Sequence, residues 1–184
     1  MSQGAAVAQL AALDYPQKVT ALTLTCATPG GPGHEHADLP PMSAALAAFF
    51  GSAFPEPDWS DRSAVIEYLV EAERPFAGSM FDATAVRELA VRIVGRTTSI
   101  ASQLTNPFVI DPGEPWRHRL GEIRVPTLVL HGTEDPLFPY GHAEALAKEI
   151  PGARLLPMPR TGHEVIPAHV WDDVVPAIVE NERR

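Results

Sequence analysis

The chain has little cysteine and few basic residues. Cys26 is the single cysteine among 184 residues, which excludes an intramolecular disulfide framework and a cysteine-based zinc site and favours a reducing compartment, the cytoplasm. The 14 lysines and arginines are outnumbered by 23 aspartates and glutamates, for a formal net charge of -9. Nucleic acid and an anionic membrane surface would both repel such a chain, so neither is expected as a partner.

Long apolar runs are also missing. The sequence holds no run of about eighteen apolar residues, and no basic segment followed by an apolar core stands at its N-terminus. A membrane span and a signal peptide are therefore not expected. The length suffices for one hydrophobic core, so we expect one domain with an inserted lobe.

The most informative stretch is VPTLVLHGTEDPLFP, residues 125–139. Its apolar residues are consecutive rather than alternating, which is typical of a parallel strand buried on both faces. Asp135 follows this strand and directly precedes Pro136, which favours an extended conformation for Asp135. Ligands and chemistry collect at the carboxyl ends of strands in open α/β sheets. Asp135 is therefore a candidate catalytic carboxylate, with Glu134 as the alternative.

A histidine and a serine complete a possible catalytic group. His163 lies in a loop, RTGHE, after a second predicted strand at residues 153–158. An acid and then a histidine, each following a strand, is the order used by α/β-hydrolases, and it requires a serine upstream. Ser2 is followed by Gly4, as a nucleophile elbow requires, and opens a predicted helix over residues 1–14 that leads to a predicted strand over residues 18–26. An ordinary loop histidine remains the alternative for His163. None of the other serines has glycine two positions later; these are Ser43, Ser52, Ser60, Ser63, Ser79, Ser99 and Ser102.

Residues 34–116 differ in character from the rest of the chain. They show no strand pattern but three helical stretches: residues 41–50, residues 61–73 capped by Ser60, and a third that starts after Asp82 and continues or breaks at Gly95. We expect an α/β core formed by residues 1–33 and 117–184, with 34–116 as an all-helical cap.

Two further expectations concern the aromatic residues of the cap and the helices that follow it. Six of the seven phenylalanines lie in the cap and, with Met42, Trp59 and Met80, favour an apolar or aromatic substrate; they are Phe49, Phe50, Phe54, Phe76, Phe81 and Phe108. After the cap, a helix over 140–150 and a last helix over 168–181 are predicted. The apolar face of the last helix is expected to hold Trp171, Val174, Val175 and Ile178.

Several of these segments together resemble a known family. SQG at 2–4, AQLAALDYP at 8–16, residues 125–136 and TGH at 161–163 resemble the α/β-hydrolase superfamily. Within it, HEVIP at 163–167 and WDDVVPAI at 171–178 are similar to the aclacinomycin methylesterase group.

The resemblance implies a partial α/β-hydrolase fold and a role for each candidate residue. It implies Ser2 as nucleophile, His163 as general base, Asp135 as the orienting acid, and the backbone N–H of Gln3 as an oxyanion donor. It implies hydrolysis of carboxylic esters without cofactor or metal. Independently of any family, a serine hydroxyl becomes nucleophilic when an imidazole held by a carboxylate removes its proton.

Other functions use the same three side chains. A lactonase, a C–C bond hydrolase and a cofactor-free perhydrolase are alternatives, and a non-catalytic binding or self-associating protein is an alternative from another class. The strands and second oxyanion donor that precede the elbow in the family have no counterpart here, so the chain resembles the C-terminal two-thirds of such an enzyme, by truncation or a misassigned start. The strand at 19–26 would then present an unpaired apolar edge, and we expect poor folding, dimerisation through that edge, or inactivity.

The remaining histidines point to no separate site. His34 and His36 form a His-x-His pair that lacks a third ligand nearby in sequence, so no metal is expected there. The others are expected at the surface or in packing, although His131 lies near the candidate site; they are His118, His131, His142 and His169.

Overall fold

The computed structural model describes residues 1–31, 33, 36–109, 111 and 113–184. His34 and the side chain of Phe108 lie outside the described part. Within it, no helix has the length and apolar character needed to cross a bilayer.

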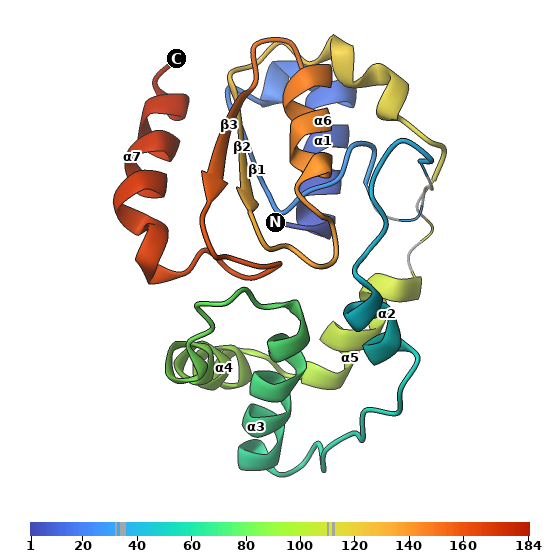
Figure 1. Ribbon diagram of the computed structural model, residues 1–184, viewed down its shortest axis with the longest axis vertical. Coiled ribbons are helices and arrows are strands. Elements are labelled where there is room, and N and C mark those ends of the chain that lie inside the picture. The colour runs from blue at the N-terminus through green and yellow to red at the C-terminus, as the bar shows by residue number, and fades with distance from the viewer. Residues whose placement is uncertain (32, 34–35, 110, 112) are drawn as a thin grey trace.

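Three parallel strands form the sheet in the order β1-β2-β3 (Figure 1). They are β1 (Leu22–Thr25), β2 (Thr127–Gly132) and β3 (Arg154–Met158). All six residues of the central strand β2 are buried, as its uninterrupted apolar pattern predicted. The predicted α/β fold with a parallel sheet is therefore confirmed.

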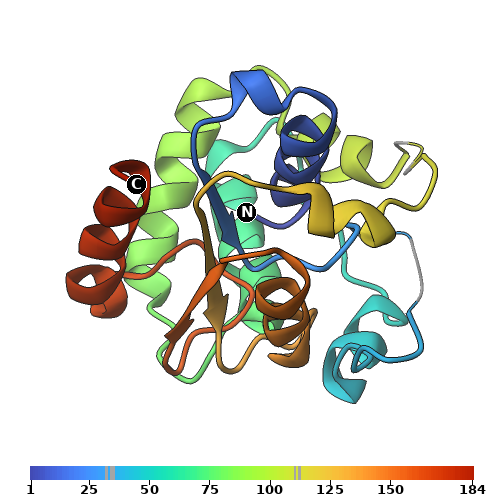
Figure 2. The ribbon, with the colours of Figure 1, turned by 90° about the horizontal axis from the view of Figure 1, so that it is seen from above.

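Helices cover both faces of the sheet, as Figures 1 and 2 show. On one face, Leu24 and Val129 pack in a core with α1 (Gln3–Asp14) and α6 (Gly141–Glu149). On the other, Leu128 and Leu130 pack with α7 (Trp171–Glu182). Successive residues of β2 thus face opposite layers, and each fully buried leucine contributes about 1.5–3 kcal/mol relative to exposure.

Between β1 and β2, the described residues form four helices in a separate layer beyond the carboxyl ends of the strands (Figure 1). Asp61 and Asp82 cap two of them by accepting hydrogen bonds from first-turn N–H groups. The helices are α2 (Ala44–Phe50), α3 (Arg62–Glu73), α4 (Ala83–Arg96) and α5 (Ile100–Thr105). Short 3-10 segments are η1 (Pro16–Lys18), η2 (Arg74–Phe76), η3 (Asn106–Val109), η4 (Arg117–Glu122) and η5 (Ala168–Val170).

Two predicted boundaries are wrong for local reasons. The strand predicted from residue 18 starts at Leu22, because Pro16 opens a 3-10 turn closed by a hydrogen bond from the Lys18 N–H to the Tyr15 carbonyl, 2.8 Å. The cap of α3 is Asp61 rather than Ser60, because Ser60 is bound to the carboxylate of Asp58.

The buried face of α7 agrees with the prediction in part, since Val174 is buried and Ile178 packs against the core. Trp171 is 53% exposed and Val175 is 52% exposed, whereas Val174, Ala177 and Asn181 face the sheet. Asn181 explains the rotation, because its buried Nδ2 donates to the Leu22 carbonyl at 3.1 Å. Asn181 was not considered in the prediction, which used apolar residues alone, yet it helps to set which side of α7 is buried.

Strand β1 lies at one edge of the described sheet. The N–H groups of Leu22 and Cys26 donate to the carbonyls of Pro126 and Leu130, on the β2 side of the strand. The N–H of Thr23 therefore faces the open edge. The side chains of Leu22 and Leu24 are nevertheless buried. The edge therefore presents backbone groups rather than the apolar side chains that we expected.

Candidate active site

Asp135 occupies a turn directly after β2. Its Oδ1 accepts hydrogen bonds from the N–H groups of Leu137 at 2.9 Å and Phe138 at 2.8 Å. The side chain is fully buried. Both donors belong to the turn that Asp135 itself opens, so local backbone geometry fixes one carboxylate oxygen and leaves the other for a partner.

That partner is His163. Its Nδ1 lies 2.8 Å from Asp135 Oδ2, and both side chains are buried. A carboxylate accepts the Nδ1 proton, which leaves the Nε2 lone pair of the neutral imidazole free to take a proton. The rings of Phe138, at 5.3 Å, and Phe76, at 6.4 Å, flank the imidazole.

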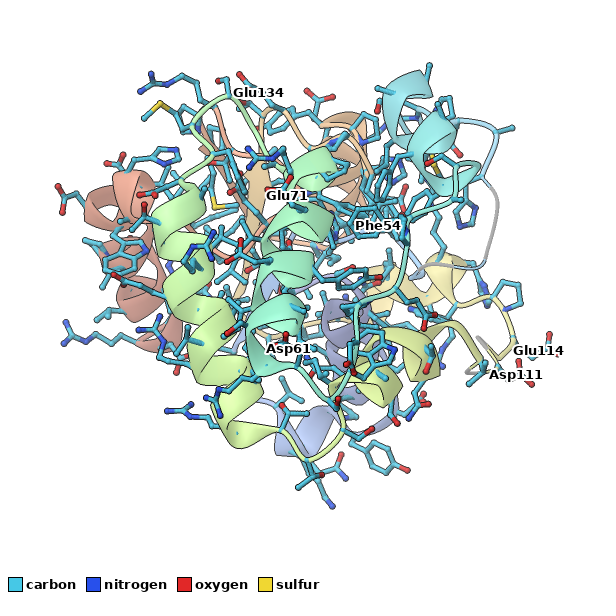
Figure 3. The ribbon with its side chains drawn as sticks, turned by 90° about the horizontal axis from the view of Figure 1, so that it is seen from below. Phe54, Asp61, Glu71, Asp111, Glu114 and Glu134 are labelled. Carbon is cyan, nitrogen blue, oxygen red and sulfur yellow. The ribbon has the colours of Figure 1, made fainter. Side chains whose placement is uncertain are left out.

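Glu134, the alternative acid, has a different partner. Its carboxylate accepts from the N–H of Ser79 at 2.6 Å and from the Ser79 hydroxyl at 3.1 Å. Figure 3 shows Glu134 beside the loop between α3 and α4. Glu134 therefore binds the cap, and Asp135 binds the histidine.

Ser2 precedes α1 in a strained backbone conformation. Its φ is 47° and its ψ is -122°, a region that side chains rarely occupy and that is common at functional turns. Its N–H donates to the Thr25 carbonyl at the end of β1, 3.0 Å away. Figure 1 accordingly marks the N-terminus beside the carboxyl ends of the strands.

Two of the three candidate side chains, Asp135 and His163, are in direct contact. Among the described residues, no hydrogen bond is found between the Ser2 hydroxyl and His163, although Ser2 stands at the same end of the sheet. Gln3 is the first residue of α1, in the first turn, where backbone N–H groups have no intrahelical acceptor and favour a negative charge.

Cys26 lies close to Asp135 and His163, and nothing in the sequence predicted this proximity. It is fully buried at φ 46°, and its Sγ is 3.7 Å from the Gly162 carbonyl. One polar atom each of Cys26, Asp135 and His163 lie within 4.8 Å of one another. Burial first, and then the charge of Asp135, raises the pKa of the Cys26 thiol to about 12. The protonated thiol is a poor nucleophile and a poor metal ligand, and the Asp135–His163 hydrogen bond accounts for the clustering.

The loop that carries His163 is joined to the cap by its backbone. The His163 N–H donates to the Phe76 carbonyl at 2.7 Å. Oε1 of Glu164 accepts from Gly78 at 3.0 Å and from Gly162 at 2.9 Å. A Cβ on Gly162 would lie 2.2 Å from the Phe76 oxygen, so the two segments touch without room for a side chain. We refer to this contact between residues 76–79 and 160–164 as the cap junction.

Other titratable groups surround the candidate pair. Desolvation raises the pKa of Glu73, at the end of α3, while the charge of His163 acts to lower it. Burial lowers the pKa of His131 and of His142, so both imidazoles are stabilised in the neutral form. His142 is held by Thr28 Oγ1 and the Pro40 carbonyl, each at 2.9 Å.

Aromatic rings connect the cap to His163. Phe49 lies 6.1 Å from Phe50, 5.4 Å from Phe54 and 6.4 Å from Phe76, whose ring is also near His163. Two hollows elsewhere, one around Arg117 and one around Trp59, are lined by neither Ser2 nor the candidate pair. The ring cluster is thus the apolar surface that adjoins the site.

Comparisons with known proteins agree with this architecture. A family described as alpha/beta hydrolase fold matches residues 1–170. Rhodomycin D methylesterase DnrP of Streptomyces peucetius is 25% identical over 197 residues, covering 100% of this chain and 65% of the relative. The chain thus spans about 65% of the length of that curated relative.

Solved structures show the same fold. The putative non-heme bromoperoxidase BpoC of Mycobacterium tuberculosis H37Rv superposes with a TM-score of 0.62 at 18% identity, covering 98% of this chain and 63% of that chain. The meta-cleavage product hydrolase CumD of Pseudomonas fluorescens IP01 gives 0.57 at 21% identity, covering 99% and 60%. These likenesses concern the fold alone.

Proposed function

We propose, on the premise that this chain belongs to the alpha/beta hydrolase fold family, that it is a serine hydrolase of carboxylic esters. The observation that carries the proposal is the buried 2.8 Å contact between His163 Nδ1 and Asp135 Oδ2. The strained turn at Ser2, at the same end of the sheet, supports Ser2 as the nucleophile.

The reaction follows from the roles of these groups. Nε2 of His163 takes the Ser2 hydroxyl proton as Oγ attacks the ester carbonyl, and Asp135 stabilises the imidazolium. The Gln3 N–H donates to the oxyanion. The C–O bond of the ester breaks, and the alcohol leaves with the proton from His163. Water, deprotonated at His163, then releases the acid from Ser2.

The substrate class follows from the aromatic cluster of the cap. Phe50 is exposed, and Phe49, Phe54 and Phe76 are only partly buried, so their rings can contact a bound apolar group. We propose an apolar or aromatic ester, and the methylesterase relative favours a methyl ester. A lactonase, C–C hydrolase or perhydrolase would use the same triad, so activity with nitrophenyl esters, lactones and peracid formation separates them.

Labelling with a fluorophosphonate probe tests the proposal, because the probe reacts with an activated serine. We expect labelling at Ser2, its loss in S2A, and retention in S63A, a control at an exposed helical serine. D135N should slow ester turnover by about 10⁴-fold, because the imidazole tautomer is no longer enforced.

An unlabelled protein contradicts the hydrolase assignment, whereas labelling that persists in S2A contradicts Ser2 as the nucleophile. The first result would favour the non-catalytic alternative, consistent with the missing hydrogen bond between Ser2 and His163. Labelling of a form extended upstream of Met1 tests the expectation that preceding strands are needed to aim the serine.

A further inference from the structure

His131, the last residue but one of β2, is a second buried imidazole at the same carboxylate. Its Nε2 lies 2.7 Å from the Phe138 carbonyl and 3.4 Å from Asp135 Oδ2, the oxygen that also binds His163. The side chain is fully buried. Both neighbours of Nε2 are acceptors, so Nε2 carries the proton.

The other ring nitrogen of His131, Nδ1, has no partner within the described part of the chain that would favour a proton there. Nδ1 is buried and has no hydrogen-bond partner among the described residues. A positive charge on the ring would leave the Nδ1 proton buried and unpaired, which burial disfavours. Consistently, the pKa of His131 is lowered, mainly by desolvation. The imidazole therefore acts as a neutral donor with one N–H.

That N–H binds the far end of the Asp135 turn, at Phe138. Phe138, whose carbonyl it binds, donates its own N–H to Asp135 Oδ1 and places its ring 5.3 Å from His163. Nε2 also lies 3.4 Å from Oδ2, the oxygen that binds His163 Nδ1, without a hydrogen bond to it. Movement of His131 would thus shift the carboxylate, the Phe138 ring and the histidine together.

We propose that His131 is a positioning residue for the hydrolytic reaction, acting through Asp135 to orient His163. The inference rests on the proposed function, since it assigns a role in the same site. His131 touches neither the serine nor an ester, and its effect passes through the carboxylate.

Three variants separate the donor from the volume of the ring. H131F keeps an aromatic ring and, because Nδ1 has no partner, removes only the Nε2 donor. H131Q carries an amide nitrogen the same number of bonds from Cβ as Nε2, whereas the amide of H131N is one bond shorter. H118Q, at an exposed histidine, is the matched control.

Two readouts are measured for each variant: ester turnover, and the pKa of His163 by NMR of labelled imidazoles, assigned with H163Q. Loss of the donor should lower kcat by about 10–100-fold, as small misplacements of catalytic groups do. The pKa of His163 should rise, because the Asp135 carboxylate then loses the polar Nε2 group 3.4 Å from Oδ2 and stabilises the imidazolium more strongly. H131Q should restore both values, and H118Q should alter neither.

Other titratable groups near His163 are unchanged in all variants. They are Glu73 from the cap, Glu164 in the loop of His163, and the Cys26 thiol. His142 and the Tyr140 ring, which lie near His131, are also unchanged. A shift confined to variants lacking the donor therefore reports on His131.

The outcomes are distinct. If H131F and H131Q lose activity equally and the His163 pKa is unchanged, His131 is only a packing residue and the inference is wrong. Unchanged activity and pKa in H131F also overturn it. If H131F does not fold, H131N provides the same comparison against H131Q. If wild type neither turns over esters nor labels at Ser2, yet the pKa pattern appears, the proposed function fails while the coupling to Asp135 stands.

Discussion

A methyl group added at the cap junction is expected to destabilise the fold strongly. In G162A, the new Cβ would lie 2.2 Å from the Phe76 oxygen and 2.5 Å from both the Ala77 carbonyl carbon and the Gly78 nitrogen. All three are backbone atoms. They cannot rotate away as a side chain would, so the loop and the cap segment must separate by roughly 1 Å to reach ordinary contact distances.

The size of the effect follows from what resists that separation. The Phe76 carbonyl accepts from His163, and the Gly78 N–H donates to Glu164. Overpacking usually costs about 1–3 kcal/mol, and weakening these bonds places G162A at the upper end. For a chain of this size, about 3 kcal/mol corresponds to a fall in Tm of roughly 6–12 °C.

Calorimetry and urea unfolding measure this difference. G121A is the matched control, because a Cβ there meets nothing within 4 Å and, as at Gly162, the backbone is compatible with alanine. Its stability should stay within about 0.5 kcal/mol of wild type. If G162A is as stable as G121A, the close contact at the cap junction is wrong.

Three further predictions concern other parts of the molecule. E164Q keeps an oxygen acceptor for Gly78 and Gly162 but loses the charge, so its free energy of unfolding should fall by about 1–2 kcal/mol. That of E164A should fall further, because two N–H groups lose their partner. Equal stability of E164A and wild type in urea would contradict this. Because the pKa values of His131 and His142 are lowered in the folded state, the stability they contribute is fully present above their ordinary value of 6.5 and is lost as the pH falls through their folded values. The urea midpoint should therefore drop as the pH is lowered toward about 5. The drop should be smaller in H142Q. If copies of the chain associate through the open edge of β1, T23P should abolish a dimer seen by light scattering without unfolding the monomer, because the Thr23 N–H faces away from β2; a dimer that survives T23P uses another surface.

The sequence was sufficient to predict the central features because they depend on local patterns. The uninterrupted apolar run of β2 and the Asp135-Pro136 pair predicted a buried strand with a carboxylate at its carboxyl end. The acid-then-histidine order predicted a pairing that the structure shows at 2.8 Å. The choice between Glu134 and Asp135 rested on one proline.

Features that depend on contacts between distant segments could not be predicted. The sequence places His131 near the candidate site, but its hydrogen bond to Phe138 and the proximity of Cys26 to Asp135 arise only when β1, β2 and the His163 loop are assembled. The buried face of α7 was partly misplaced for the same reason, since Asn181 binds a strand far away in sequence. Periodicity reports which residues share a face, but not which polar partner that face meets.

The cap junction places a constraint on any attempt to exchange the cap for that of another protein. The segment that follows η2 and the loop that bears His163 fit closely, with Gly78 and Gly162 where they touch. A foreign cap grafted without its own version of the 160–164 loop would meet that loop with mismatched backbone. Exchange of both segments as one module, residues 76–79 with 160–164, would preserve the fit between them.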